Sequence, residues 1–62
     1  MKLSPAMKWA LRQADEITPE LFRIRRDTDY RTARALQSRW LCIFDSNTLT
    51  PAGIAERERL LK

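Results

Sequence analysis

Three hydroxyl-proline pairs divide this chain and indicate where its helices begin. They are Ser4-Pro5, Thr18-Pro19 and Thr50-Pro51, and they contain all three prolines of the sequence. A Ser or Thr oxygen accepts an amide N–H from the first turn of a helix, and proline at the first helical position lacks only an N–H that has no partner there. Each pair therefore predicts a helix start.

The first predicted helix begins after Ser4 and runs for about ten residues. Its apolar residues recur at helical spacing and fall on one face, which we expect to be buried. These residues are Met7, Ala10, Leu11 and Ala14. Trp9 lies outside this stripe, and we expect it to cover a neighbouring loop or to lie in a dimer interface.

A short second helix is predicted over residues 18–25, because Leu21 and Ile24 share a helical face. The polar residues 26–29 then predict a turn, and a third helix is expected over about residues 29–39. The caps expected for this third helix are Thr28 or Asp27. Two helices joined by so short a turn form a helix-turn-helix.

A helical wheel of the third helix separates an apolar face from a basic one. The face expected in the core carries Ala33, Leu36 and Trp40, with Tyr30 and Gln37 at its margin. The opposite, outward face carries two long cations and two small residues, which are Arg31, Arg34, Ala35 and Ser38.

The pattern changes at residues 41–44, a continuous apolar run that is typical of a strand. Residues 45–47 predict a turn, and residues 48–49 are expected to pair back in a minimal hairpin. Thr50 then starts a last helix that reaches the end of the sequence. Gly53 in its first turn lowers helix stability by about 1 kcal/mol relative to alanine, so we expect a close packing contact there.

Few residues of this chain can support catalysis or metal binding. Its 62 residues are expected to form one domain, residues 1–62, with no histidine and a single cysteine, Cys42. This set provides no zinc site, no Ser-His or Cys-His pair and no internal disulfide. Cys42 stands in an apolar run, which favours a buried thiol, and the carboxylates stand at expected helix ends and turns. We therefore expect no enzyme activity, no cofactor and no metal, and a cytoplasmic chain without a membrane-spanning stretch.

The positive charge is concentrated in the predicted helix-turn-helix. Residues 23–39 contain six arginines and two aspartates, a balance equal to the whole net charge of +4. Arginine binds phosphate oxygens and the guanine edge through two N–H groups, which favours DNA as a partner. The alternative is an ordinary solvated surface in a chain that also uses arginine elsewhere, at Arg12, Arg57 and Arg59.

If the third helix binds in the major groove of DNA, its outward residues have different expected contacts. Arg31 and Arg34 face base edges, Thr32 and Ser38 hydrogen-bond to bases or phosphates, and the small Ala35 permits close approach. The other arginines are expected mostly to neutralise the phosphate backbone, and these are Arg23, Arg25, Arg26 and Arg39.

The predicted order of elements resembles a winged helix-turn-helix domain, a mainly α (α+β) fold. Residues 31–41 resemble a recognition helix that runs into the first wing strand. The segment Leu49-Thr50-Pro51-Ala52-Gly53 is similar to the Leu-Thr-x-x-Gly segment that closes the wing in MarR-type regulators and in many small phage and prophage proteins. The resemblance covers residues 4–62. It implies three to four short helices with a minimal β-hairpin wing, and sequence-specific binding of double-stranded DNA by a small transcriptional regulator.

A protein partner is the alternative to DNA. On the same fold, Trp9, Phe22 or the C-terminal helix would dock a partner such as a component of the transcription machinery. RNA is less favoured, because Phe22, Tyr30 and Trp40 are expected in the core and leave no stacking platform for bases. A homodimer is expected, because one short recognition helix rarely supplies enough affinity and so small a core is marginal.

Overall fold

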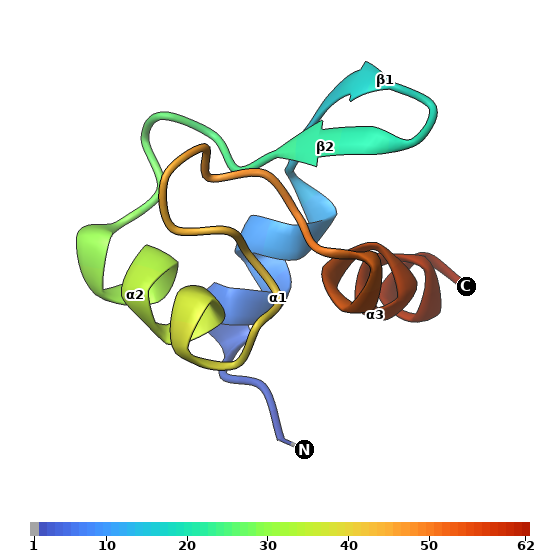
Figure 1. The fold of residues 1–62 in the computed structure, drawn as a ribbon. Coiled ribbons are helices and arrows are strands. Elements are labelled where there is room, and N and C mark those ends of the chain that lie inside the picture. Colours follow the sequence, from blue (N-terminus) through green and yellow to red (C-terminus); the bar gives the residue numbers. More distant parts are fainter. Residues whose placement is uncertain (1) are drawn as a thin grey trace.

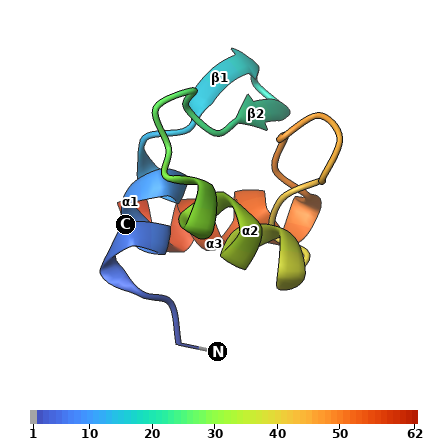
Figure 2. The same ribbon diagram turned by 90° about the vertical axis from the view of Figure 1, so that its left-hand side faces the viewer.

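The structure is a computed structural model that describes residues 2–62, with three helices and one two-stranded antiparallel hairpin (Figure 1). The elements follow in the order α1 (Pro5–Arg12), β1 (Asp15–Thr18), β2 (Leu21–Arg23), α2 (Tyr30–Ser38) and α3 (Pro51–Leu61). Helix α1 packs against both α2 and α3, which lie on opposite sides of it, and the β1–β2 hairpin lies above the three helices (Figure 2). The fold is thus a small α+β arrangement, and none of the helices within residues 2–62 could cross a bilayer.

Two of the three hydroxyl-proline pairs begin helices as predicted. The Ser4 hydroxyl accepts the Met7 N–H at 3.2 Å at the start of α1. The Thr50 hydroxyl accepts the Gly53 N–H at 3.1 Å at the start of α3. Proline follows the cap directly in both helices, so local capping chemistry accounts for both starts.

The third pair, Thr18-Pro19, lies where strands β1 and β2 join, so the helix predicted over residues 18–25 is wrong. Proline has a fixed φ that suits a turn as well as the first turn of a helix. Phe22 and Ile24 are buried while their neighbours are exposed, which is the period of two that a strand produces. A hairpin therefore precedes α2 where the helix-turn-helix required a helix.

Helix α2 matches the third predicted helix to within one residue at each end. Its cap is Asp29, whose carboxylate accepts the Arg31 N–H at 3.1 Å, and not the predicted Thr28 or Asp27. Leu36 is fully buried, as the helical wheel predicted. The helix is thus fixed in rotation by its apolar face, and this fixes which side chains point away from the core.

Trp40 is 78% exposed and Tyr30 is 70% exposed, so the prediction that these aromatics lie at the core face is wrong. Helix α2 ends two residues before Trp40, where the backbone turns through a φ of 59°. The Trp40 N–H donates to the Gln37 carbonyl at 3.1 Å, and the Leu41 N–H donates to the Leu36 carbonyl at 3.0 Å. This is the Schellman arrangement that ends many helices. A helical wheel does not apply beyond it, and the indole is directed into solvent.

Residues 41–50 form the predicted hairpin in a shortened form. Cys42 and Leu49 make an antiparallel bridge. On its other side, the Leu49 N–H donates to the Phe22 carbonyl at 2.8 Å, which joins this segment to β2. The loop of residues 44–47 is thereby held close to the chain that connects β2 to α2.

The core is built around the predicted stripe of α1, all of whose residues are buried. The largest fully buried side chains are Leu11, Leu36, Leu41 and Cys42. Gly53 packs so closely against this core that an added Cβ would overlap the Leu41 carbonyl oxygen. The expected close contact at Gly53 is therefore confirmed, and it seats α3 against the residues that follow α2.

Candidate functional site

The outward face of α2 carries basic side chains at the predicted positions. Arg31, Arg34 and Ser38 are exposed and, at spacings of three and four residues, they share one face of the helix. Ala35 is half-buried beside this face. Thr32 is only 9% exposed and belongs to the buried side of α2. The expectation that Thr32 contacts a ligand is therefore wrong, because its hydroxyl does not belong to the exposed surface.

A groove runs between α2, the segment that follows β2 and the loop of residues 44–47. Its volume is about 750 Å³. The Gln37 amide donates to the Asn47 side-chain oxygen at 3.1 Å, and this bond ties the loop to α2 along the groove. Four arginines are among the lining residues, which are Arg23, Arg25, Arg26 and Arg34. No Asp or Glu of residues 2–62 lines the groove, so its electrostatic potential is positive.

Arg25 is the one arginine of this region that forms an ion pair within residues 2–62. Its Nε donates to the Asp27 carboxylate at 3.0 Å. This hydrogen bond raises the pKa of Arg25 and holds the pKa of Asp27 below its ordinary value. Arg34 instead donates to the Tyr30 hydroxyl at 2.8 Å, which leaves its charge uncompensated.

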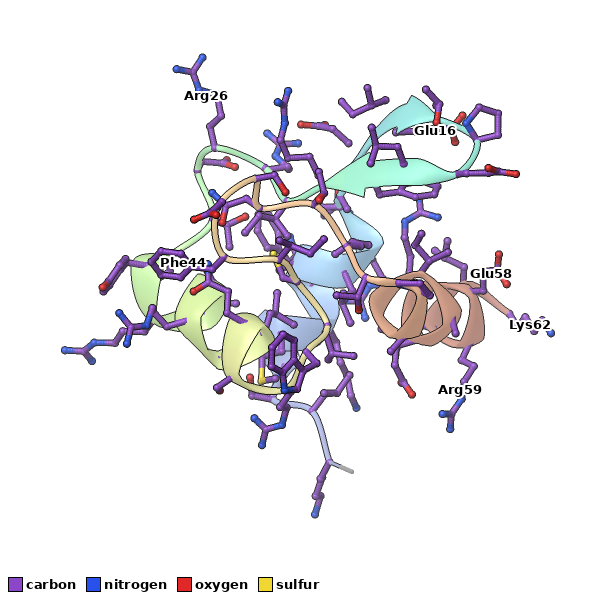
Figure 3. All side chains as sticks on the ribbon, in the orientation of Figure 1. Glu16, Arg26, Phe44, Glu58, Arg59 and Lys62 are labelled. Carbon is purple, nitrogen blue, oxygen red and sulfur yellow. The ribbon has the colours of Figure 1, made fainter. Side chains whose placement is uncertain are left out.

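The other arginines of residues 23–39 have no carboxylate oxygen within 4.0 Å in the part of the chain that the structure describes. These are Arg23, Arg26, Arg31 and Arg39. Arg26 extends from the loop between β2 and α2 into solvent, on the side of the molecule that also carries Phe44 (Figure 3). The acidic side chains of Glu16 and Glu58 lie on the hairpin and on α3, away from this side. The surface around α2 therefore presents several free cations together.

Three exposed aromatic side chains line the groove or the smaller hollow beside it. Tyr30 and Phe44 line it, and Phe44 is 67% exposed. Phe44 also lines a smaller neighbouring hollow of about 260 Å³, together with Trp40. Arg34 and Gln37 line both hollows, so aromatic and polar side chains share one edge of α2. Figure 3 shows Phe44 between the loop and the first turns of α2.

No family model, curated protein or solved structure matches this chain. Its function is therefore inferred from the side chains, charges and hollows of the structure itself.

The aromatic side chains are functional candidates that the sequence prediction placed elsewhere. Tyr30 and Trp40 were expected at the core face of a helix, and Phe44 in an apolar strand. Two signals in the sequence point to exposure. Phe44 adjoins the turn of residues 45–47, where side chains face solvent, and Trp40 follows the end of a helix. Both signals depend on where the helix and the strand end.

Other kinds of site have weaker support. Cys42 is buried, and burial raises the pKa of its thiol, so the thiol is protonated and inaccessible at neutral pH. Residues 2–62 contain no group of three or more His, Cys, Asp or Glu side chains placed to hold a metal ion. The basic and aromatic surface around α2 is therefore the strongest candidate site.

Proposed function

We propose that the chain binds double-stranded DNA as a small transcriptional regulator with a winged-helix-like layout. The observation that carries this proposal is the gathering of arginines around α2, of which only Arg25 forms an ion pair within residues 2–62, beside a groove that no Asp or Glu of these residues lines. The remainder of the chain has equal numbers of cations and anions, so the net charge of +4 belongs to this region. A duplex carries closely spaced phosphates, and neutralising them releases counterions, which drives association.

In this proposal α2 lies in the major groove, which is wide enough for one helix. Arg31 and Arg34 extend from its exposed face to base edges. Ser38 and the half-buried Ala35 are small and allow the helix to approach the bases. The other basic side chains neutralise phosphates on either side, and these are Arg23, Arg25, Arg26 and Arg39.

The β1–β2 hairpin takes the place of the helix that precedes a recognition helix in a helix-turn-helix. Residues 41–50 supply the wing, because they form a short antiparallel bridge directly after α2. We propose that two copies bind together, on half-sites about one helical turn of DNA apart. A second copy doubles the contacts that one nine-residue helix can make.

Fluorescence anisotropy with a labelled duplex of random sequence tests this function. For the wild type, we expect the logarithm of affinity to fall with the logarithm of salt concentration at a slope of about −4 to −5, as four to six phosphate contacts require. The variant Arg31→Ala/Arg34→Ala removes two free cations from α2. A duplex of random sequence offers no matched base edges, so Arg31 and Arg34 neutralise phosphates there, and we expect the variant to weaken binding about tenfold or more at low salt and to reduce the slope by roughly two.

The matched control is Arg59→Ala/Lys62→Ala, which removes the same formal charge from α3, far from Arg26 and Phe44 (Figure 3). We expect it to change duplex affinity by less than about threefold, because exposed charges beyond a Debye length are largely screened. An equal loss in both variants contradicts contact through α2. Absence of duplex binding at low salt contradicts the DNA function and favours a protein partner at Trp9 or α3.

A further inference from the structure

The exposed aromatic side chains beside α2 have no role in the duplex contact proposed above. A duplex offers base edges and phosphates to a protein, whereas the faces of its bases are covered by stacking. Tyr30 and Phe44 nevertheless line the larger hollow beside α2, Phe44 and Trp40 line the smaller one, and all three are largely exposed. Single exposed apolar side chains are common, but a contiguous group of them marks a binding surface.

Among the three aromatic residues, Trp40 gives the strongest indication of a binding role, because its backbone conformation is one that glycine or asparagine usually adopts. Its φ of 59° lies in the left-handed region, which bulky side chains rarely adopt, and glycine or asparagine is usual at this position after a helix. Trp40 takes part in the hydrogen bonds at the end of α2 through its backbone N–H and carbonyl and not through its indole. The indole is not part of the core either. Packing therefore does not explain the tryptophan, and residues held in such a conformation concentrate at functional sites.

We propose that Tyr30, Phe44 and Trp40 stack on unpaired bases, so that a single-stranded nucleic acid binds along this edge of α2. An aromatic ring stacks on any base, because every base has a flat π-face. Phe44 lines both hollows, with Tyr30 in the larger and Trp40 in the smaller, so successive bases have successive rings. Arg34 lines both hollows as well and lies within reach of the connecting phosphates.

Charge favours a nucleic acid over a protein as the occupant of this edge. Four arginines line the larger hollow, and neither hollow is lined by an Asp or Glu of residues 2–62. An apolar protein segment would cover the aromatic rings but leave Arg23, Arg26 and Arg34, which have no carboxylate partner within residues 2–62, without one. A strand with one phosphate for every base satisfies both the rings and the arginines. Helix α2 is only about 13 Å long, so the site holds a few nucleotides.

This inference rests on the proposed nucleic-acid function for its arginines, but it assigns a separate role to the aromatic rings. The decisive variant is Trp40→Gly, because glycine suits the left-handed backbone that tryptophan strains. We expect Trp40→Gly to melt no lower than the wild type and to lose about tenfold in affinity for labelled oligo-dT or oligo-rU. Its affinity for a blunt duplex is expected to stay within about twofold, because the edge contacts of α2 remain.

Phe44→Ala is the second variant, since Phe44 is exposed and outside the core, and we expect it to behave in the same way. Trp9→Phe is the matched control, because it changes the other tryptophan of the chain and leaves the proposed platform intact. It also makes Trp40 the sole tryptophan. Oligo-dT is then expected to quench the Trp40 fluorescence on binding, whereas the blunt duplex is expected to leave it almost unchanged.

The outcomes separate this inference from the proposed function. Selective loss of single-strand binding in Trp40→Gly and Phe44→Ala supports the stacking role, and comparison of oligo-dU with oligo-rU, which share one base, identifies the preferred sugar. Unchanged single-strand affinity in both variants, or unquenched Trp40 fluorescence at saturation, overturns it. The duplex function still stands in that case if Arg31→Ala/Arg34→Ala weakens duplex binding. Single-strand binding without duplex binding supports the stacking role and overturns the duplex function, and binding of neither overturns both.

Discussion

Helices α2 and α3 flank α1 on opposite sides, and both carry arginines. The arginines of α3 interact with other side chains of the same chain. Arg59 donates to the Glu56 carboxylate at 2.7 Å, one turn earlier in the same helix. The guanidinium of Arg57 lies 4.4 Å from the centre of the Phe22 ring and covers that side chain. Each of these two cations therefore has a partner within the fold.

The arginines of α2 have a different environment. Arg31, and Arg39 at the C-cap of the helix, have no carboxylate oxygen within 4.0 Å in residues 2–62, and Arg34 donates to a neutral hydroxyl. The number of arginines is thus a weaker indication of function than the partners that each one has within the fold. An unpaired cation beside a groove is available to a phosphate, whereas a cation stacked on a core aromatic is not.

The largest expected effect concerns the packing contact between Gly53 of α3 and the Leu41 carbonyl. Gly53→Ala places a methyl group against the Leu41 carbonyl oxygen, which cannot move without disturbing the end of α2. We expect the free energy of unfolding to fall by about 2–3 kcal/mol, as for other overpacked sites. In a domain of this size each 1 kcal/mol lowers Tm by about 4–8 °C, which thermal denaturation detects.

The control for this prediction is Ala55→Gly, at an exposed position of the same helix. It lowers helix propensity without any steric change, so we expect a loss of about 1 kcal/mol. If Gly53→Ala melts at the same temperature as the wild type, this contradicts the close packing of Gly53 against the Leu41 carbonyl.

A smaller effect distinguishes the arginines of the two helices directly. We expect Arg57→Ala to lower the free energy of unfolding by about 1–2 kcal/mol, because it removes a stacked cation and exposes the Phe22 ring. We expect Arg34→Ala to stay within about 0.5 kcal/mol of the wild type, as is usual for exposed sites. Urea denaturation measures both. Equal losses in the two variants would contradict the difference between α2 and α3 described above.

The smallest effect concerns Arg25, the one arginine near α2 that is paired in the described chain. Asp27→Asn removes its partner, and we expect duplex affinity at neutral pH to rise about twofold to fivefold with a steeper salt dependence. Anisotropy at two salt concentrations measures this change. Lower affinity in the variant would contradict competition between Asp27 and phosphate for Arg25.

The Arg25–Asp27 pair also makes the stability of the fold depend on pH. The pKa of Asp27 is lowered in the folded chain, so its pairing with Arg25 stabilises the fold above the ordinary value of 3.8. This contribution is lost as the pH falls through the lowered pKa. We therefore expect the wild type to have a higher Tm than Asp27→Asn at pH 6, and this difference in Tm to diminish towards pH 2.

Helix starts could be predicted from the sequence where they depend on adjacent residues. Ser4 and Thr50 cap the helices that follow them, because a cap needs only its own hydroxyl and the next amides. Thr18-Pro19 carries the same local signal but lies between two strands. Strand pairing, in which Phe22 also bonds to Leu49 far along the chain, decided the structure there. Non-local hydrogen bonds of this kind leave little trace in local sequence.

The sequence predicts the exposed arginines of the candidate site but not the positions of its aromatic side chains. Arg31 and Arg34 are exposed on α2 as expected, because the apolar face of the helix fixes its rotation. A helical wheel places Trp40 in the core only if it is extended past Ser38, where α2 ends. The place of Phe44 depends on how the loop of residues 44–47 folds back onto the helix. The combination of rings and arginines became visible only in the folded chain.

The Thr50 hydroxyl has a further consequence for how the molecule opens. It donates to the Trp40 carbonyl and accepts the Gly53 N–H, so one oxygen joins the segment after α2 to the start of α3. Local fluctuations that release one end must also release the other. In hydrogen exchange, the amides of Leu41 and Gly53 are therefore expected to share one protection factor, and Thr50→Val should lower both together. Trp40, at one end of the proposed stacking surface, and the first turn of α3 then open together as a single cooperative unit.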